Sequence, residues 1–289
     1  MTAPTQVATE KSGIKGRLPV IRIEPTSGWF GFNFRELWEF RDLLFFLTWR
    51  DIKVRYKQTL LGAAWAVLQP VLTMVIFSVI FGQLAKLPSE GIPYPLFTYT
   101  ALLPWQLFAF ALTQSSNSLV GNQNLVSKVY FPRLIIPIAA TIPSLVDFAI
   151  AFVVLIGMMF FYHEPLTYRV LALPLLLLLA LATALAVGLW LSALNVEYRD
   201  IRYVVPFLTQ FWMYATPIAY TATLIPARWR LLYGLNPMTG VVEGFRWALL
   251  GSVESVGGLV WISVAIVLLM LVSGMVYFRR MEDSFADVI

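Results

Sequence analysis

The chain has 289 residues, of which 59% are hydrophobic and 13% are charged, about half the charged share of an average soluble domain. It has no cysteine and one histidine, His163, which excludes a disulfide framework and a thiol nucleophile and argues against a metal site. The net charge of +5 comes from basic residues that flank apolar runs rather than forming one stripe, which argues against nucleic-acid binding.

The N-terminal part divides into two segments. Residues 1–33 mix Thr, Pro, Gly and Lys without periodicity and are predicted to form a flexible cytoplasmic N-terminus, with no cleavable signal peptide. In residues 34–57, apolar side chains recur at helical spacing, with Trp38 and Trp49 among the aromatic ones. This pattern predicts an amphipathic interfacial helix, because aromatic rings favour the boundary between lipid and water.

Six long apolar runs follow. Each can supply the roughly 20 residues that a helix needs to cross about 30 Å of hydrocarbon. Lipid forces the backbone to satisfy its own hydrogen bonds, which favours helices, and the short alternating segments of a barrel do not occur. We therefore predict an all-α polytopic membrane protein with a six-helix domain over residues 58–280 and a cytoplasmic tail over 281–289. The runs are 58–85, 91–127, 134–162, 170–196, 203–227 and 255–278.

The orientation follows from the basic residues. An even number of spans places both termini on one side of the membrane. If that side is cytoplasmic, the inner segments hold sixteen of the 21 Lys and Arg residues, as the positive-inside rule predicts. The inner segments are then 1–57, 121–133, 197–202 and 279–289.

Two connections between the runs have a distinctive pattern. The inner connection 121–133 is predicted to hold a short helix that stops at Pro132. The long outer connection between the last two runs is predicted to form two half-helices around 234–237. We favour a re-entrant hairpin over 221–252, and a surface lid is the alternative. Glu243 and Arg246, three residues apart on the second half-helix, are predicted to form an ion pair at the outer face.

Four segments together resemble one family, the type-2 ABC exporter permeases of bacterial polysaccharide export, with O-antigen and teichoic-acid export permeases the most similar. The segments occur in order and at matching places between spans across residues 35–280. They are RDIKVRYKQTLLGAAW (50–65) followed by Gln69-Pro70, KVYFPR (128–133), VEYRDI (196–201), and LNPM (235–238) followed by EGFR (243–246).

This resemblance implies a function. The chain would be the membrane subunit of an ATP-driven exporter of lipid-linked polysaccharide in the bacterial cytoplasmic (inner) membrane. It would form a homodimer that binds two copies of a separate ABC ATP-binding subunit, which binds ATP and Mg. The chain has no G-x-x-x-x-G-K-[ST] motif, so we expect no enzyme activity, no cofactor and no catalytic or metal-binding residues in it. The alternatives are a stand-alone secondary transporter or a lipid scramblase.

The coupling surface for the ATP-binding subunit should lie in the N-terminal helix and the inner connections, because these segments are cytoplasmic and charged. The candidate coupling residues are Arg50, Asp51, Lys128, Arg133, Glu197, Arg199 and Asp200. The candidate residues of the outer hairpin are Asn236, Pro237, Glu243 and Arg246.

A conduit for sugars should combine aromatic planes with polar groups, because sugar rings have apolar faces and polar rims. The first and fifth runs carry such side chains at helical spacing. The alternative is ordinary polar and aromatic contact between helices. The candidate conduit residues are Trp65, Gln69, Thr73, Phe207, Phe211 and Tyr214.

Asp147 is the one acidic residue inside a predicted span. A carboxylate there costs about 2.5–3.5 kcal/mol on insertion scales, so it should face the helix bundle. Because no basic partner is evident, we favour a hydrogen bond to Ser, Thr or the backbone. A functional role, such as proton coupling, is the alternative.

Overall fold

The computed structural model describes residues 34–57, 63–251, 257–282 and 284–285. The segment predicted to be a flexible N-terminus, 1–33, lies outside the described residues. In the part of the chain that is described, the regular structure is helical throughout. The predicted all-α class is therefore confirmed.

The N-terminal helix is interrupted at Phe40, giving α1 (Phe34–Glu39) and α2 (Arg41–Lys57). Apolar side chains lie on both sides of α2. Leu47 is buried, whereas Phe45 and Trp49 are exposed. One apolar side, with Leu37, Phe40, Leu44 and Leu47, packs on the bundle, and aromatic rings also lie on the other side.

Five helical runs among the described residues are long and apolar enough to cross a membrane. The first is α3 (Ala64–Phe77) with the π-helix Ser78–Leu84, and the second is α4 (Tyr94–Gly121). The third joins α6 (Ile135–Thr141) to α7 (Pro143–Phe161). The fourth joins the 3-10 helix Tyr168–Ala172 to α8 (Leu173–Glu197), and the fifth lies in α12 (Gly257–Glu282). These runs correspond to five of the six predicted spans.

The remaining predicted span, 203–227, is helical only in its first part. Helix α9 (Ile201–Tyr214) has 14 residues and is therefore about 21 Å long, too short to cross the hydrocarbon as a helix. The chain then continues without regular helix through Thr216 and Pro217. Proline disfavours helical geometry in the residue before it and lacks an N–H donor, which explains why the helix ends here.

The connections also form short helices. The inner connection contains the predicted short helix, α5 (Gln123–Lys128), but it ends at Lys128 rather than at Pro132. The outer connection contains α10 (Ala227–Gly234) and α11 (Pro237–Leu250), which confirms the two predicted half-helices. Asn236 caps α11 by accepting a hydrogen bond from the Met238 N–H at 3.0 Å, and Pro237 occupies the first helical position.

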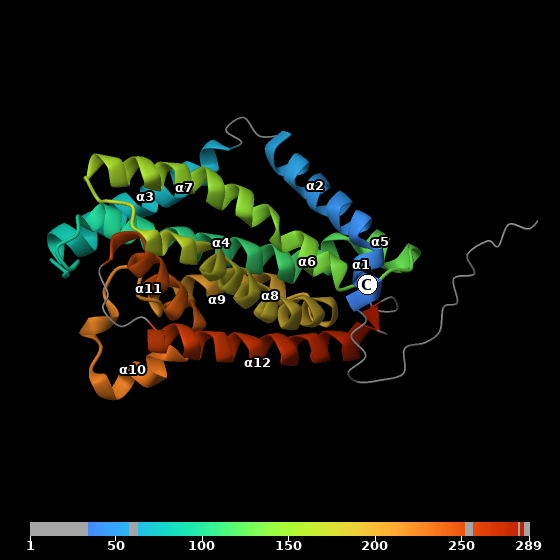
Figure 1. Ribbon diagram of the computed structural model, residues 1–289. Coiled ribbons are helices and arrows are strands. Elements are labelled where there is room, and N and C mark those ends of the chain that lie inside the picture. The colour runs from blue at the N-terminus through green and yellow to red at the C-terminus, as the bar shows by residue number, and fades with distance from the viewer. Residues whose placement is uncertain (1–33, 58–62, 252–256, 283, 286–289) are drawn as a thin grey trace, which may run out of the picture. The chain divides into compact units, whose positions relative to one another are not determined.

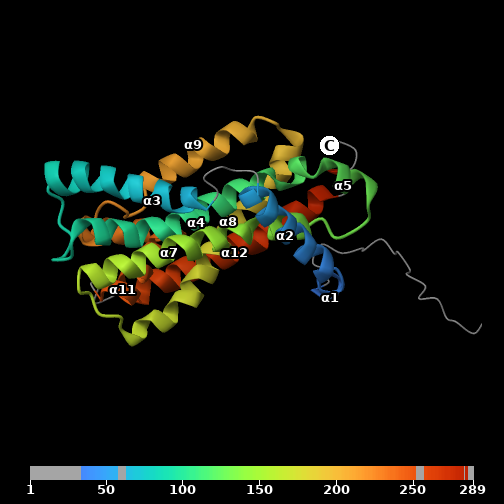
Figure 2. The ribbon, with the colours of Figure 1, turned by 90° about the horizontal axis from the view of Figure 1, so that it is seen from above.

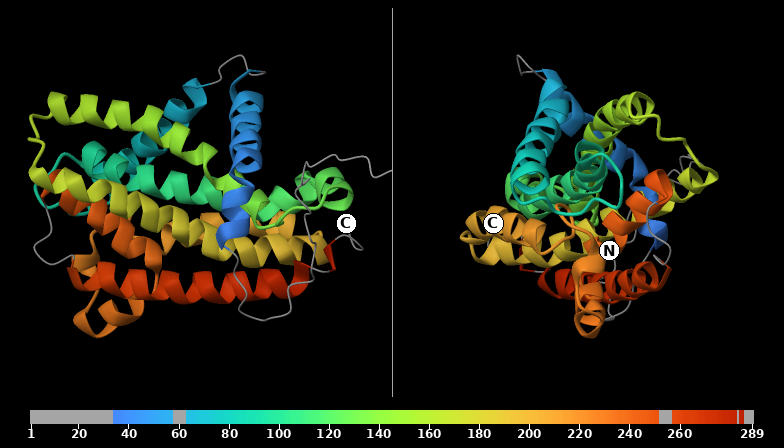
Figure 3. Two further views of the ribbon diagram at one scale, coloured as in Figure 1. Left: turned by 45° about the vertical axis from the view of Figure 1, so that its right-hand side comes forward. Right: turned by 90° about the vertical axis from the view of Figure 1, so that its left-hand side faces the viewer.

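Helix α4 is the centre of the packing. In its most apolar window 78% of residues are buried, compared with 17–39% in the other four candidate spans. Figures 1 and 3 show α4 between α3 and α7 on one side and α8 and α12 on the other. Small residues permit close contact: a Cβ at Gly188 in α8 would come within 2.4 Å of Ser115 Oγ in α4.

Candidate functional sites

The side chain of Arg50 joins α2 to the connection between α4 and α5. Its Nε donates to Asp51 Oδ1 at 2.9 Å, and its Nη2 donates to Asn122 Oδ1 at 2.8 Å. Asn122 in turn donates to the Ser118 carbonyl. The two candidate coupling residues of α2, Arg50 and Asp51, thus make contacts within the chain and fix how α2 meets the inner connection.

Arg133 also makes contacts within the chain. Its guanidinium donates to the Glu282 carbonyl, and its backbone N–H donates to Glu282 Oε1 at 3.1 Å. These bonds join the connection after α5 to the end of α12. Figure 1 shows α1, α5 and the end of α12 at the same end of the bundle.

The other candidate coupling residues form part of an exposed group on the inner connections. We call this group the inner patch. The α8–α9 connection contributes Tyr198, and the neighbouring Glu197 carboxylate raises the pKa of the Tyr198 hydroxyl. Charged side chains thus lie beside aromatic and apolar ones, and Tyr and Arg are enriched where proteins meet. The inner patch comprises Lys128, Val129, Tyr130, Glu197, Tyr198, Arg199 and Asp200.

Asp147 has a basic partner, contrary to the sequence-based expectation. The Arg55 guanidinium in α2 donates from Nε to Oδ1 at 3.2 Å and from Nη2 to Oδ2 at 2.5 Å. The Tyr56 hydroxyl also donates to Oδ1, and the Phe110 ring centroid lies 3.9 Å from Arg55 Cζ. The prediction of a Ser, Thr or backbone partner was therefore wrong. The basic residues within 50–57, just before the first predicted span, could have suggested a cationic partner for Asp147.

The six candidate conduit residues lie on uncovered or partly covered faces of α3 and α9. Both helices pack against α4, and Figure 2 shows them along the same edge of the bundle. Phe207 and Phe211 are stacked with centroids 6.5 Å apart and are 71% and 66% exposed. Trp65 and Tyr214 are also exposed, whereas the Thr73 hydroxyl donates to the Gln69 carbonyl at 2.9 Å. Within one chain these residues form two aromatic faces rather than one enclosed site.

The non-helical stretch after α9 is held by Arg246 of α11. This side chain is fully buried and donates to three carbonyls, those of Pro217 at 2.6 Å, Ile218 at 2.7 Å and Tyr220 at 3.2 Å. It also pairs with Glu243 at 3.2 Å, which confirms the predicted ion pair and places it in the interior. The spacing of Glu243 and Arg246 in the sequence indicated their ion pair but not the hydrogen bonds from Arg246 to the three carbonyls.

Two further side chains complete this arrangement. Asn236 accepts from Trp212 Nε1 at 2.8 Å and donates to the Ala215 carbonyl at 3.2 Å. The Tyr94 hydroxyl donates to the Ala219 carbonyl at 2.5 Å. Side chains therefore replace the helical hydrogen bonds along this stretch. We call Tyr94, Asn236, Glu243 and Arg246 the outer polar cluster.

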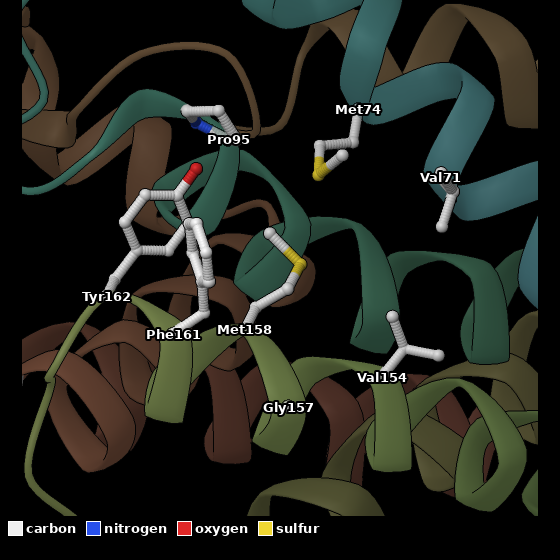
Figure 4. Close-up of a pocket in the computed structure, with 8 residues that line it drawn as sticks. All are labelled: Val71, Met74, Pro95, Val154, Gly157, Met158, Phe161 and Tyr162. Carbon is white, nitrogen blue, oxygen red and sulfur yellow. The ribbon is translucent and has the colours of Figure 1, made fainter.

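An apolar groove of about 590 Å³ lies between α3 and α7 at the start of α4. Figure 4 shows Met74 of α3 and Met158 of α7 extending into the space between these helices. A Cβ added at Gly157 would meet no other atom within 4 Å, so the groove is open at this point. None of the candidate conduit residues lines it. The lining residues are Val71, Met74, Pro95, Val154, Gly157, Met158, Phe161 and Tyr162.

Comparison with known proteins adds independent information. The sequence pattern described as ABC-2 type transporter matches residues 42–250. The chain is 30% identical over 216 residues to the O-antigen export system permease protein RfbA of Myxococcus xanthus, covering 73% of this chain and 82% of that protein. It is 28% identical to an RfbA of Klebsiella pneumoniae, covering 86% and 95%. It is 25% identical to the polysialic acid transport protein KpsM of Escherichia coli, covering 81% and 92%.

Proposed function

Because this chain belongs to the ABC-2 type transporter family and is the membrane subunit of an ABC exporter, we propose that it exports a lipid-linked polysaccharide of the O-antigen type across the bacterial inner membrane. The observation that carries this proposal is that relatives named for O-antigen export and polysialic acid transport align with 73–86% of the chain. A lipid-linked teichoic acid is the alternative substrate. Family membership disfavours a stand-alone secondary transporter or scramblase.

The proposed topology has six crossings with both termini cytoplasmic. The fifth crossing combines α9 with the non-helical residues 215–221. Such backbone is tolerated at membrane depth only where protein or a cavity satisfies its polar groups. The outer polar cluster supports this placement because it supplies donors to the carbonyls of Ala215 and residues 217–220.

The half-helices α10 and α11 form the re-entrant hairpin in this proposal. Asn236 lies at their junction and bonds to Trp212, two residues before α9 ends. The junction is therefore level with α9 rather than beyond its end, which favours a hairpin that returns toward the membrane over a surface lid. The proposed interfacial position of α2 rests on the exposed aromatic residues Phe45, Phe46 and Trp49.

The proposed assembly is a homodimer with two ATP-binding subunits, which bind ATP and Mg. The inner patch is the docking surface, because it is exposed and combines charges with aromatic residues. The exposed aromatic faces of α3 and α9 would line the conduit between two copies of the chain. Aromatic planes can hold the apolar faces of sugars weakly enough for transport, since passage needs both entrance and release.

A reconstitution experiment tests the proposed function. The chain is co-expressed with its ATP-binding subunit in cells that synthesise the lipid-linked glycan but lack an exporter. Surface polysaccharide should appear only when both subunits are present. It should disappear when the phosphate-loop lysine of the partner is replaced, at unchanged amounts of folded permease. Export by this chain without the ATP-binding subunit would contradict the proposal.

A further inference from the structure

Helix α2 is tied to the bundle by polar contacts at two levels. Arg50 bonds to Asn122 at the α4–α5 connection, and Arg55 bonds to Asp147 in α7. Five residues of helix separate these contacts by about 7.5 Å along the axis. One side chain of α2 therefore reaches the inner connection while another reaches the third candidate span.

The two halves of α2 are packed differently. Leu47 and Thr48 are buried in the first half, whereas Val54 in the second half is 60% exposed. A cavity of about 300 Å³ lies beside the second half. The apolar packing there is incomplete, so polar contacts have a larger part in holding it. The cavity is lined by Asp51, Val54, Arg55, Phe110, Gln114, Ala140 and Pro143.

The contact between Arg55 and Asp147 is suited to fixing a position. Its two N–H groups meet the two carboxylate oxygens, and this forked geometry restrains direction as well as distance. The side chains are 35% and 17% exposed, so the pair is less screened than one on an open surface. The Tyr56 hydroxyl donates to the same carboxylate, and burial, followed by this hydrogen bond, raises the pKa of Tyr56 to about 12.

We propose that Arg55 and Asp147 are positioning residues that tie α2 to α7, so that α2 carries movement from the Asn122 connection to the third span. This inference rests on the proposed function, because an ATP-binding subunit docked on the inner patch would supply the movement. Tyr56 and the Phe110 ring hold the pair in place. Breaking the tie should therefore separate ATP hydrolysis from export without preventing assembly.

The test compares Asp147→Asn, Arg55→Gln and the charge exchange Arg55→Asp/Asp147→Arg in the assembled transporter. Each single variant should lower export per folded permease at least fivefold, while ATP hydrolysis stays within twofold of wild type. The exchange should recover at least half of the lost export. Arg41→Gln is the matched control, because Arg41 also lies in α2 but its pairing is with the neighbouring Asp42 at an exposed site.

Several results would overturn the inference. Unchanged normalised export in Asp147→Asn would show that the tie is not needed. A parallel fall in export and ATP hydrolysis, or a loss of folded protein that the exchange does not restore, would assign the pair a static structural role.

A measurement that does not depend on export keeps this inference separate from the proposed function. The chain has no native cysteine, so a spin label can be placed on Val54→Cys alone. Its mobility should increase when Asp147→Asn is added and should stay unchanged with Arg41→Gln. Equal mobility in all three proteins would show that the contact between Arg55 and Asp147 does not restrain α2. Absence of export by the wild-type complex would instead count against the proposed function.

Discussion

The guanidinium of Arg246 donates a hydrogen bond to the Pro217 carbonyl at 2.6 Å and so joins α11 to the stretch where the chain leaves α9. An arginine with no exposed surface would be costly alone, but here it has a carboxylate partner, three carbonyls and the Phe97 ring at 3.6 Å. The arrangement stabilises non-helical backbone in the interior of an otherwise helical protein.

Replacing Arg246 should destabilise the fold. Arg246→Ala leaves Glu243 buried without its cation and removes donors from three carbonyls, and breaking a buried pair costs about 3–5 kcal/mol. We expect a large loss of folded permease, measured by size-exclusion chromatography and thermal unfolding in detergent. Arg246→Lys keeps the positive charge, but a single ammonium nitrogen cannot reach all three carbonyls as the guanidinium does. The stability of this variant should therefore be intermediate. A melting temperature for Arg246→Ala equal to that of wild type would contradict this prediction.

Two substitutions at Asn236 separate its functions as acceptor and donor. Asn236→Asp keeps the oxygen that caps α11 and accepts from Trp212 but loses the donor to Ala215. Asn236→Ala loses all of these contacts, and the cap alone is worth about 1 kcal/mol. Thermal unfolding should place wild type above both variants, because Asn236→Asp also introduces a carboxylate beside the Ala215 carbonyl. A melting temperature for Asn236→Ala equal to that of wild type would show that these contacts contribute nothing.

Charge reversal on the inner patch should uncouple transport. Lys128→Glu and Arg199→Glu change exposed side chains, so folded permease should persist while export per permease falls several-fold through loss of docking. Arg133→Glu should instead lower the amount of folded permease, because Arg133 contacts Glu282 within the chain. Normal export by both inner-patch variants would exclude these charges from coupling.

The placement of the outer hairpin can be tested by thiol labelling. Leu235 and Lys86 are both exposed in the single chain, so protein packing does not shield either one. If the hairpin re-enters the membrane, a cysteine at Leu235 should react with a bulky, membrane-impermeant reagent at least tenfold more slowly than one at Lys86. A cysteine at the partly exposed Tyr233 should be shielded as well, whereas Met238 is buried in the chain and does not distinguish the two placements. Similar rates at Leu235 and Lys86 would favour a surface lid.

The aromatic faces of α3 and α9 should affect the rate of export. Each aromatic contact is worth about 1 kcal/mol, so Trp65→Ala or Tyr214→Ala should slow normalised export up to about fivefold. The double variant should be slower than either single one. Surface polysaccharide per folded permease is the measurement. If only the folded amount falls, these residues serve in packing between helices rather than in the conduit.

The sequence by itself determined the helical class, five of the spans and the two half-helices that meet at Asn236 and Pro237. These features depend on local properties. The thickness of the bilayer sets the length and apolarity of each span, and capping chemistry acts between neighbouring residues. The spacing of Glu243 and Arg246 likewise suffices to predict their ion pair.

Only the tertiary structure decided how far α9 extends and what Asp147 contacts. Arg55, the partner of Asp147, is 92 residues away from it in sequence. Arg246 donates to carbonyls that are 26–29 residues away in sequence. Local propensity carries no information about such contacts. A helix can end early inside the protein when distant side chains replace its hydrogen bonds, and a buried carboxylate is tolerated when folding brings a cation to it.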